Sequence, residues 1–98
     1  MSLTTHDATA TMTVQLRYFA AAAEAAGAPS EEVTLPVGAT AKDLLQAIGA
    51  ERPELRRVLD ISSLLVDGVV REDRSLPLQT AGTPTALRVD VLPPFAGG

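Results

Sequence analysis

The sequence predicts an α+β domain in which a mixed five-stranded sheet packs on one main helix and continues into an extended tail. Short runs of alternating apolar and polar residues, which are typical of half-buried strands, occur in both halves of the chain. One longer run instead repeats its apolar residues at helical spacing, between a helix-start and a helix-stop signal. The expected strands are residues 12–18, 31–36, 62–66, 69–71 and 86–92.

The first and last strands show the clearest alternation, with apolar side chains on one face of each. The inward positions are Met12, Val14, Leu16 and Tyr18 in the first strand, and Leu87, Val89 and Val91 in the last. Phe19 and Leu92 break this pattern, because each places a large apolar side chain on the polar face. For Phe19 an alternative is that the strand has already ended and the ring turns back into the core.

The segment that follows the first strand is built mainly of alanine. Residues 20–26 are expected to form a short helix, since alanine is the best helix former. Gly27 suits the left-handed position that closes a helix, and Pro29 prevents the helix from continuing. The strand at 31–36 then places Val33 and Leu35 inward and pairs with the first strand in a hairpin-like unit.

The main helix is expected to begin after Thr40, a favourable N-cap with Asp43 at capping-box spacing. Its apolar stripe consists of Ala41, Leu44, Leu45 and Ile48. Gly49 ends this helix, and Pro53 opens a second, short helical turn. The core-facing residues of that turn are Leu55, Val58 and Leu59.

A hairpin and an apolar patch are expected in the second half of the chain. Asp67-Gly68 between apolar β-formers predicts a tight turn that pairs the strands around it. If the first and last strands are neighbours, Phe19 and Leu92 lie together at the root of the tail, and Val70 extends the patch from the hairpin. Exposed apolar patches commonly mark partner surfaces, so Phe19, Val70 and Leu92 are predicted to form a partner interface.

Composition argues against several classes of function. A chain of 98 residues forms one domain with a modest core and no room for a large enclosed substrate cavity. The net charge of −4 argues against nucleic acid as a partner. With no cysteine and the single histidine His6, neither a metal site nor a nucleophile–histidine pair is expected. No membrane-spanning run or signal peptide is recognisable, which favours a cytoplasmic protein that does not bind membranes.

The chain ends in Leu-Pro-Pro-Phe-Ala-Gly-Gly, residues 92–98. Prolines keep this backbone extended and glycines make its end a thin thread, which spans on the order of 20 Å. We therefore expect a mobile leader (1–11), a β-sheet domain (12–92) and a flexible, functional tail (93–98). The tail residues expected to enter the active sites of partner proteins are Pro93, Pro94, Phe95, Ala96 and Gly97. The chemistry is expected on the carboxylate of Gly98.

Several motifs carry a resemblance to a known family. The most specific is the Pro-Pro-x-x-Gly-Gly ending at 93–98. The others are Leu16-Arg17-Tyr18-Phe19-Ala20 with Glu24 and Gly27, Val37-Gly38-Ala39-Thr40 before Asp43-Leu44-Leu45, and Val66-Asp67-Gly68. From residue 13 to residue 98 the chain resembles the ubiquitin-like β-grasp sulfur carriers of the MoaD/ThiS family, most closely the small subunit of molybdopterin synthase. The resemblance implies that the first and last strands are central, parallel neighbours.

The resemblance also implies a chemistry. An ATP-dependent adenylating enzyme of the ubiquitin-activating type would convert the Gly98 carboxylate to an acyl-adenylate. A sulfur donor, either a rhodanese-like protein or a cysteine desulfurase, would then replace AMP to leave a C-terminal thiocarboxylate. In molybdopterin synthase the tail enters the large subunit and gives its sulfur to a pterin precursor of the molybdenum cofactor. The chain itself would bind no cofactor or metal and would have no active site of its own.

Three alternatives stay open at this point. The first is delivery of sulfur to thiamine or cysteine biosynthesis. The second is a ubiquitin-like protein modifier, in which Gly98 forms an isopeptide bond with a lysine of a partner. The third is a non-covalent interaction module whose tail is structural.

Overall fold

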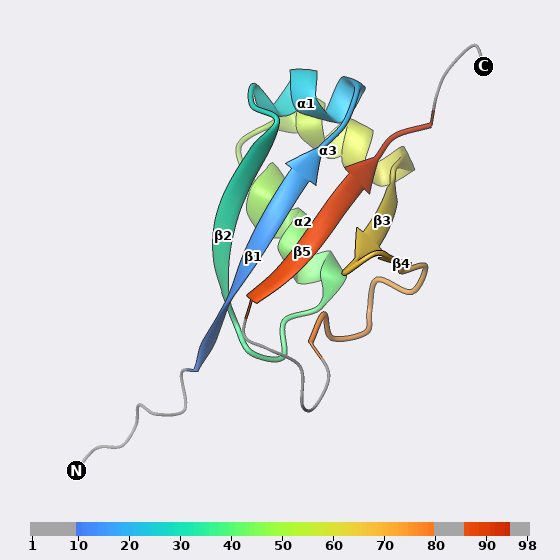
Figure 1. Ribbon diagram of the computed structural model, residues 1–98. Helices are drawn as coiled ribbons and strands as arrows, with labels where there is room; N and C mark the ends of the chain where they lie inside the picture. Colours follow the sequence, from blue (N-terminus) through green and yellow to red (C-terminus); the bar gives the residue numbers. More distant parts are fainter. Residues whose placement is uncertain (1–9, 80–85, 95–98) are drawn as a thin grey trace.

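The computed structural model describes residues 10–79 and 86–94, which form one sheet with helices against one of its faces (Figure 1). The strands are β1 (Thr11–Tyr18), β2 (Ser30–Pro36), β3 (Ser63–Val66), β4 (Val69–Val70) and β5 (Ala86–Leu92). The helices are α1 (Ala21–Ala26), α2 (Ala41–Gly49) and α3 (Pro53–Ile61). The predicted leader, apart from residues 10 and 11, and the tail beyond Pro94 lie outside the described residues.

The strand order β2-β1-β5-β3-β4 makes this a mixed sheet. β1 and β5 are parallel and central, with Arg17 opposite Asp90 and Tyr18 opposite Val91. The other pairs, β1 with β2, β3 with β5 and β3 with β4, are antiparallel. This confirms the predicted five-stranded mixed sheet and the β-grasp arrangement that the resemblance implied.

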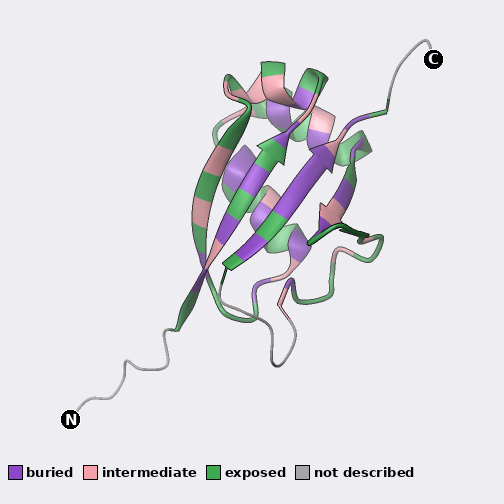
Figure 2. Ribbon diagram, viewed as in Figure 1, coloured by how far each residue is buried: buried purple, intermediate pink, exposed green. Residues whose placement is uncertain are grey.

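The core lies between the sheet and the helices, as the alternation predicted. Alternate residues of β1 and β5 are buried on this side, and in β5 the buried stretch is continuous over 89–91 because Asp90 of the opposite face is buried too (Figure 2). The inward residues predicted for these strands are all buried: Met12, Val14, Leu16, Tyr18, Leu87, Val89 and Val91. The helices close the core with Ala22, Ala41, Leu44, Ile48, Leu55 and Leu59. Val33, Leu45 and Val58 are partly buried and pack against it.

Local signals fix the turns between the elements. The Thr40 hydroxyl accepts a hydrogen bond from the Asp43 amide at 3.1 Å, and the Asp43 carboxylate accepts one from the Thr40 amide at 3.0 Å, which completes the capping box. Asp67 and Gly68 have φ values of 50° and 84°, the left-handed values of a tight two-residue hairpin. The Asp67 carboxylate also accepts from the Arg88 amide at 3.0 Å, which ties this hairpin to β5.

Some boundaries differ from the predicted ones. β1 begins at Thr11, one residue earlier, and β2 begins at Ser30. Ser62, expected in a strand, instead caps α3, because its hydroxyl donates to the Val58 carbonyl at 2.6 Å. α3 is also longer than a turn, and with nine residues it equals α2. None of the helices in the described part of the chain is long and apolar enough to cross a membrane.

Candidate functional site

The face of the sheet that none of the described helices covers carries the first part of the site. Register places Arg17 of β1 opposite Asp90 of β5, and Asp90 opposite Leu65 of β3. Leu65 in turn lies opposite Val70 of β4. Because opposite residues project to the same face, these four side chains form one row across four strands.

A second row lies one step nearer the C-terminal ends of β1 and β5. The amide of Phe19 donates to the Val91 carbonyl at 3.2 Å, which continues the parallel pairing and brings Phe19 beside Leu92. Leu92 lies opposite Ser63 on its other side. Phe19 is half-buried, is absent from the core cluster and lies under the Arg17 guanidinium, 5.4 Å from the ring centroid. The ring therefore lies on the open face, and the alternative that it turns back into the core is wrong.

The two rows together form an apolar surface, which we call the tail-root patch: Phe19, Leu65, Val70 and Leu92. The sequence predicted three of its members. The structure places Phe19 beside Leu92, whereas Val70 lies two strands from β5 and joins the patch through Leu65. Leu65 was missed, although two adjacent leucines in a strand mean that one of them faces away from the core. Val70 is the most exposed member, with 57% of its surface open to solvent.

An ion pair lies inside this patch. Arg17 Nε is 3.1 Å from Asp90 Oδ1, and the two side chains are unequally exposed, 51% for arginine and 13% for aspartate. Asp90 is therefore held by its partner, whereas the remaining N–H groups of the guanidinium face solvent. The pair neutralises the carboxylate within the patch and leaves directional donors for a partner.

β5 delivers the tail to the edge of the tail-root patch. After Leu92 the inward alternation continues for one residue, since Pro93 is buried and Pro94 is exposed. The first predicted tail residue, Pro93, is thus still packed on the domain, and the described chain is exposed again at Pro94. Phe95, Ala96, Gly97 and Gly98 lie outside the described residues.

A polar network on the core side fixes the end of β1 behind the patch. The Tyr18 hydroxyl donates to Glu31 Oε1 at 2.6 Å, and Arg52 Nη2 contacts both oxygens of that carboxylate at 2.9 and 3.1 Å. Burial, and then the hydrogen bond to the Glu31 carboxylate, raise the pKa of Tyr18 well above its ordinary value. This network joins β1, β2 and the start of α3 immediately before Phe19, so the patch rests on a fixed base.

The described residues offer no metal site, because no three histidine or acidic side chains among them gather closely enough to hold an ion. What the site does provide is a rigid strand that ends in an extended segment, beside an apolar surface. This arrangement suits the class of proteins in which the segment after a strand is presented to a partner.

Comparison with known proteins agrees with this class. The family model described as "ThiS family" matches residues 16–98. A search among curated proteins finds no match. The structure of the Haloferax volcanii HVO 2177 protein has a TM-score of 0.69 and 30% identity, over 90% of this chain and 88% of that one.

Two further solved structures have similar scores. A putative molybdopterin converting factor subunit 1 from Pyrococcus furiosus has a TM-score of 0.70 and 25% identity, over 86% of this chain and 99% of that one. SAMP1 from Haloferax volcanii has a TM-score of 0.69 and 26% identity, over 88% of this chain and 99% of that one.

Fold and site together define a ubiquitin-like β-grasp protein of the sulfur-carrier and modifier class. The chain belongs to the ThiS family, as its sequence motifs indicated.

Proposed function

We propose that this chain carries sulfur as a thiocarboxylate on Gly98. The observation that supports this most strongly is the way the chain ends. A central strand, hydrogen-bonded on both sides, runs into a segment that is exposed at Pro94, beside an apolar surface. The family match extends over this segment to residue 98.

The proposed chemistry begins at the Gly98 carboxylate, which is a poor electrophile until it is activated. A carboxylate oxygen of Gly98 attacks the α-phosphate of ATP, which releases pyrophosphate and leaves an acyl-adenylate. The terminal sulfur of the donor's persulfide then forms a C–S bond while the C–O bond to AMP breaks, which gives an acyl disulfide. A thiol cleaves the S–S bond of this acyl disulfide, which leaves the thiocarboxylate on Gly98 and a disulfide on the donor side. The activating enzyme uses the ATP, so the carrier needs no bound cofactor or metal and supplies no catalytic side chain. Gly97 and Gly98 suit this role because a narrow channel admits a backbone without Cβ atoms.

The pathway we propose is molybdenum cofactor biosynthesis, with this chain as the small subunit of molybdopterin synthase. Its likeness to the Pyrococcus furiosus subunit supports this assignment. The partners would be the large subunit, an adenylating enzyme of the ubiquitin-activating type and a sulfur donor, which is a rhodanese-like protein or a cysteine desulfurase. The tail-root patch would bind the first two in turn, and all these steps would take place in the cytoplasm.

A second candidate is a protein modifier, and the likeness to SAMP1 favours it. It uses the same adenylate, but a lysine amine rather than sulfur attacks the Gly98 carbonyl. Both candidates therefore need an activated chain end and differ in the nucleophile.

Thiol labelling tests the proposal. The purified chain is incubated with an adenylating enzyme of the family, ATP and sulfide, and is then treated with a thiol-reactive reagent. Because the chain contains no cysteine, any label reports newly acquired sulfur. Labelling that requires ATP and disappears when Gly98 is deleted is the expected result. No labelling with enzymes that activate related carriers would refute the proposal.

The pathway is tested by adding acceptors to the loaded carrier. With a molybdopterin synthase large subunit and the cyclic pterin precursor, we expect loss of the label and formation of the dithiolene. Sulfur transfer only with a thiazole-forming or cysteine-forming system would move the chain to another pathway. ATP-dependent conjugates on a denaturing gel would favour the modifier.

A further inference from the structure

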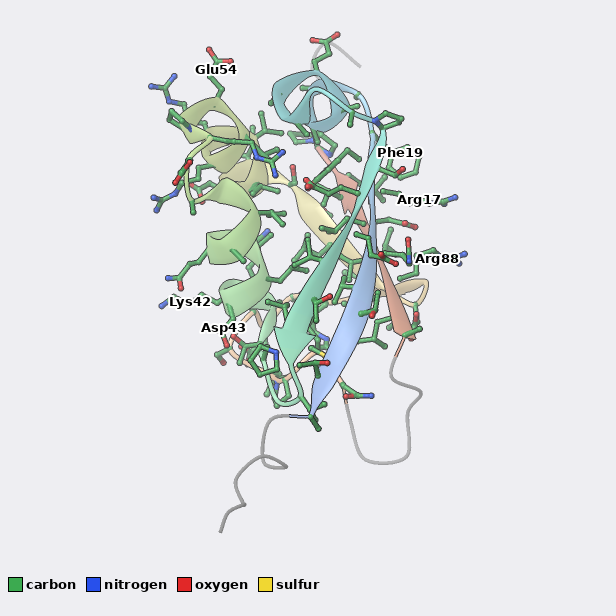
Figure 3. The ribbon with its side chains drawn as sticks, turned by 90° about the vertical axis from the view of Figure 1, so that its left-hand side faces the viewer. Arg17, Phe19, Lys42, Asp43, Glu54 and Arg88 are labelled. Carbon is green, nitrogen blue, oxygen red and sulfur yellow. The ribbon has the colours of Figure 1, made fainter. Side chains whose placement is uncertain are left out.

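Almost all basic side chains of this protein are arginines. Seven are arginines and only one, Lys42, is a lysine. Lys42 lies on the first turn of α2, is exposed, and its ammonium has no hydrogen-bond or ion-pair partner among the described residues. Figure 3 shows that Lys42 projects outward from the helices, whereas Arg17 and Arg88 project outward from the opposite side of the molecule.

Lys42 lines a pocket of about 170 Å³ between α2, α3 and the segment that follows β4. Its apolar floor is made by Leu45 and Leu59, and its polar wall includes Arg56, Asp60 and Arg74. Three cations and one carboxylate thus line one hollow in a protein whose net charge is −4. Such a hollow attracts an anionic group.

The two arginines of the pocket are held in place by the fold. Arg74 donates to the Leu59 carbonyl at 3.2 Å and to the Ser62 carbonyl at 2.5 Å, which fixes it at the end of α3. Arg56 lies so closely over Gly49 that a Cβ there would be 2.5 Å from its Cγ. The Arg74 guanidinium is therefore fixed by hydrogen bonds, the stem of Arg56 is confined beside Gly49, and both cations line the pocket with Lys42.

We propose that this pocket receives the tail of a second copy and that Lys42 is the acceptor of an isopeptide bond from its Gly98. The activated tail is complementary to the pocket, because its last three residues, 96–98, are small and the adenylate on Gly98 carries an anionic phosphate. The tail comes from a second copy rather than from the same chain. Lys42 is on the first turn of α2, which begins at one end of the sheet, whereas β5 ends and releases its own tail at the opposite end (Figure 1). This inference rests on the proposed activation of Gly98.

The reaction balances with ATP as the only co-reactant. Adenylation of Gly98 in the donor copy releases pyrophosphate. The neutral Lys42 Nζ of the acceptor copy then attacks the Gly98 carbonyl carbon. A C–N bond forms, the C–O bond to AMP breaks, and the amine proton passes to water. Arginine cannot replace lysine here, because its guanidinium stays protonated. Lys42 is thus the only side chain of this protein with a primary amine, and so the only one on which its own activated end can form an isopeptide bond.

The test uses the full chain, an adenylating enzyme of the family and ATP, without sulfide. The expected result is a ladder of linked chains on a denaturing gel. Trypsin cuts after Arg88, so the linked peptide should carry residues 89–98 as a branch on Lys42. Lys42→Arg, which keeps the charge, should abolish that branch and the ladder. Arg56→Gln should lower linkage roughly fivefold, since it removes one of the three cations that line the pocket.

A double variant separates the pocket from simple amine access. Lys42→Arg combined with Arg57→Lys moves the only lysine to an exposed site on α3 that does not line the pocket. The proposal expects little linkage in this variant. Linkage equal to that of the natural chain, or a branch on the N-terminal amine only, would overturn it.

Two further measurements separate failure of the proposed function from failure of the acceptor site: release of pyrophosphate in the same samples, and sulfur loading in parallel samples that contain sulfide. Absence of both would refute the proposed function. Normal activation and sulfur loading without any branch on Lys42 would overturn the acceptor site alone.

Discussion

The two faces of the sheet use the same strands for different purposes. On the covered face, β1 and β5 present only apolar residues and Tyr18, and all of them are buried. On the open face the same strands present Arg17, Asp90, Phe19 and Leu92, of which only Asp90 is buried. The covered face holds the domain together, whereas the open face keeps apolar area in contact with solvent and thereby remains available to a partner.

The contrast extends to polar groups. Asp90 on the open face pairs with a half-exposed arginine, whose other donors can reach another protein. Tyr18 on the covered face gives its hydroxyl to Glu31, which Arg52 also binds, so that the network is closed within the chain. Substitutions on the two faces should therefore separate stability from recognition.

The largest effect on stability is expected for Leu16→Ala. Leu16 is fully buried between the sheet and the helices, and its truncation should lower the free energy of unfolding by about 2–5 kcal/mol. Urea denaturation measures this change. Thr13→Ala, on the open face of the same strand, is the matched control and should change stability by less than about 0.5 kcal/mol. Equal losses in the two variants would contradict the assignment of the faces.

Phe19→Ala should weaken partner binding strongly and change stability little, which is the reverse of the effect expected for Leu16→Ala. We expect it to weaken binding to the adenylating enzyme roughly tenfold or more, because large aromatic side chains dominate partner interfaces. Its free energy of unfolding should fall by only about 1 kcal/mol, since the ring is not part of the core. The KM for the carrier in ATP–pyrophosphate exchange reports binding. Leu76→Ala is the control, because Leu76 is also exposed and apolar but lies outside the tail-root patch. If both variants bind equally well, the patch is not the interface.

Tyr18→Phe should show a pH-dependent effect. Near pH 7 it loses one hydrogen bond to a carboxylate, at a cost of about 1–2 kcal/mol. Since folding raises the pKa of Tyr18, its contribution is fully present below the ordinary value of about 10 and is lost as the pH rises towards the raised value. The stability difference between the two proteins should therefore shrink above about pH 10.

Absorbance of the phenolate checks the same claim directly. Tyr18 is the only tyrosine and the chain has no tryptophan, so the signal has one source. At a pH just above the ordinary pKa, the folded protein should show less phenolate than the protein in urea. Equal phenolate absorbance in both states would contradict the buried network.

The smallest effect is expected for Arg17→Gln. An exposed ion pair contributes about 0.2–1 kcal/mol to stability. Because the Arg17 side chain is half-exposed, we expect the substitution to lower the free energy of unfolding by an amount in this range. Arg88→Gln is the control, because the guanidinium of Arg88 has no partner among the described residues and lies on the same face. A loss of several kcal/mol for Arg17→Gln would mean that the pair belongs to the folded core rather than to the partner surface.

Sequence patterns predicted what depends on local periodicity. The alternation in residues 12–18 and 86–92 gave the covered face, and the Thr40–Asp43 spacing gave the start of α2. Leu65 was missed because two neighbouring leucines do not show which of them faces the core. The Tyr18–Glu31–Arg52 network and the Lys42 pocket could not be predicted from the sequence, because each is formed by elements that are far apart in sequence. The burial of Pro93 was missed because proline signals an extended backbone and says nothing about where that backbone lies.

The most direct test of the central claim is the mass of the C-terminal tryptic fragment, residues 89–98, after reaction with the adenylating enzyme, ATP and sulfide. This fragment contains no methionine, so oxidation of methionine cannot imitate the exchange of oxygen for sulfur. The account predicts that one oxygen of Gly98 is replaced by sulfur, only when ATP is present. An unchanged fragment in a reaction that consumes ATP and forms the adenylate would contradict it.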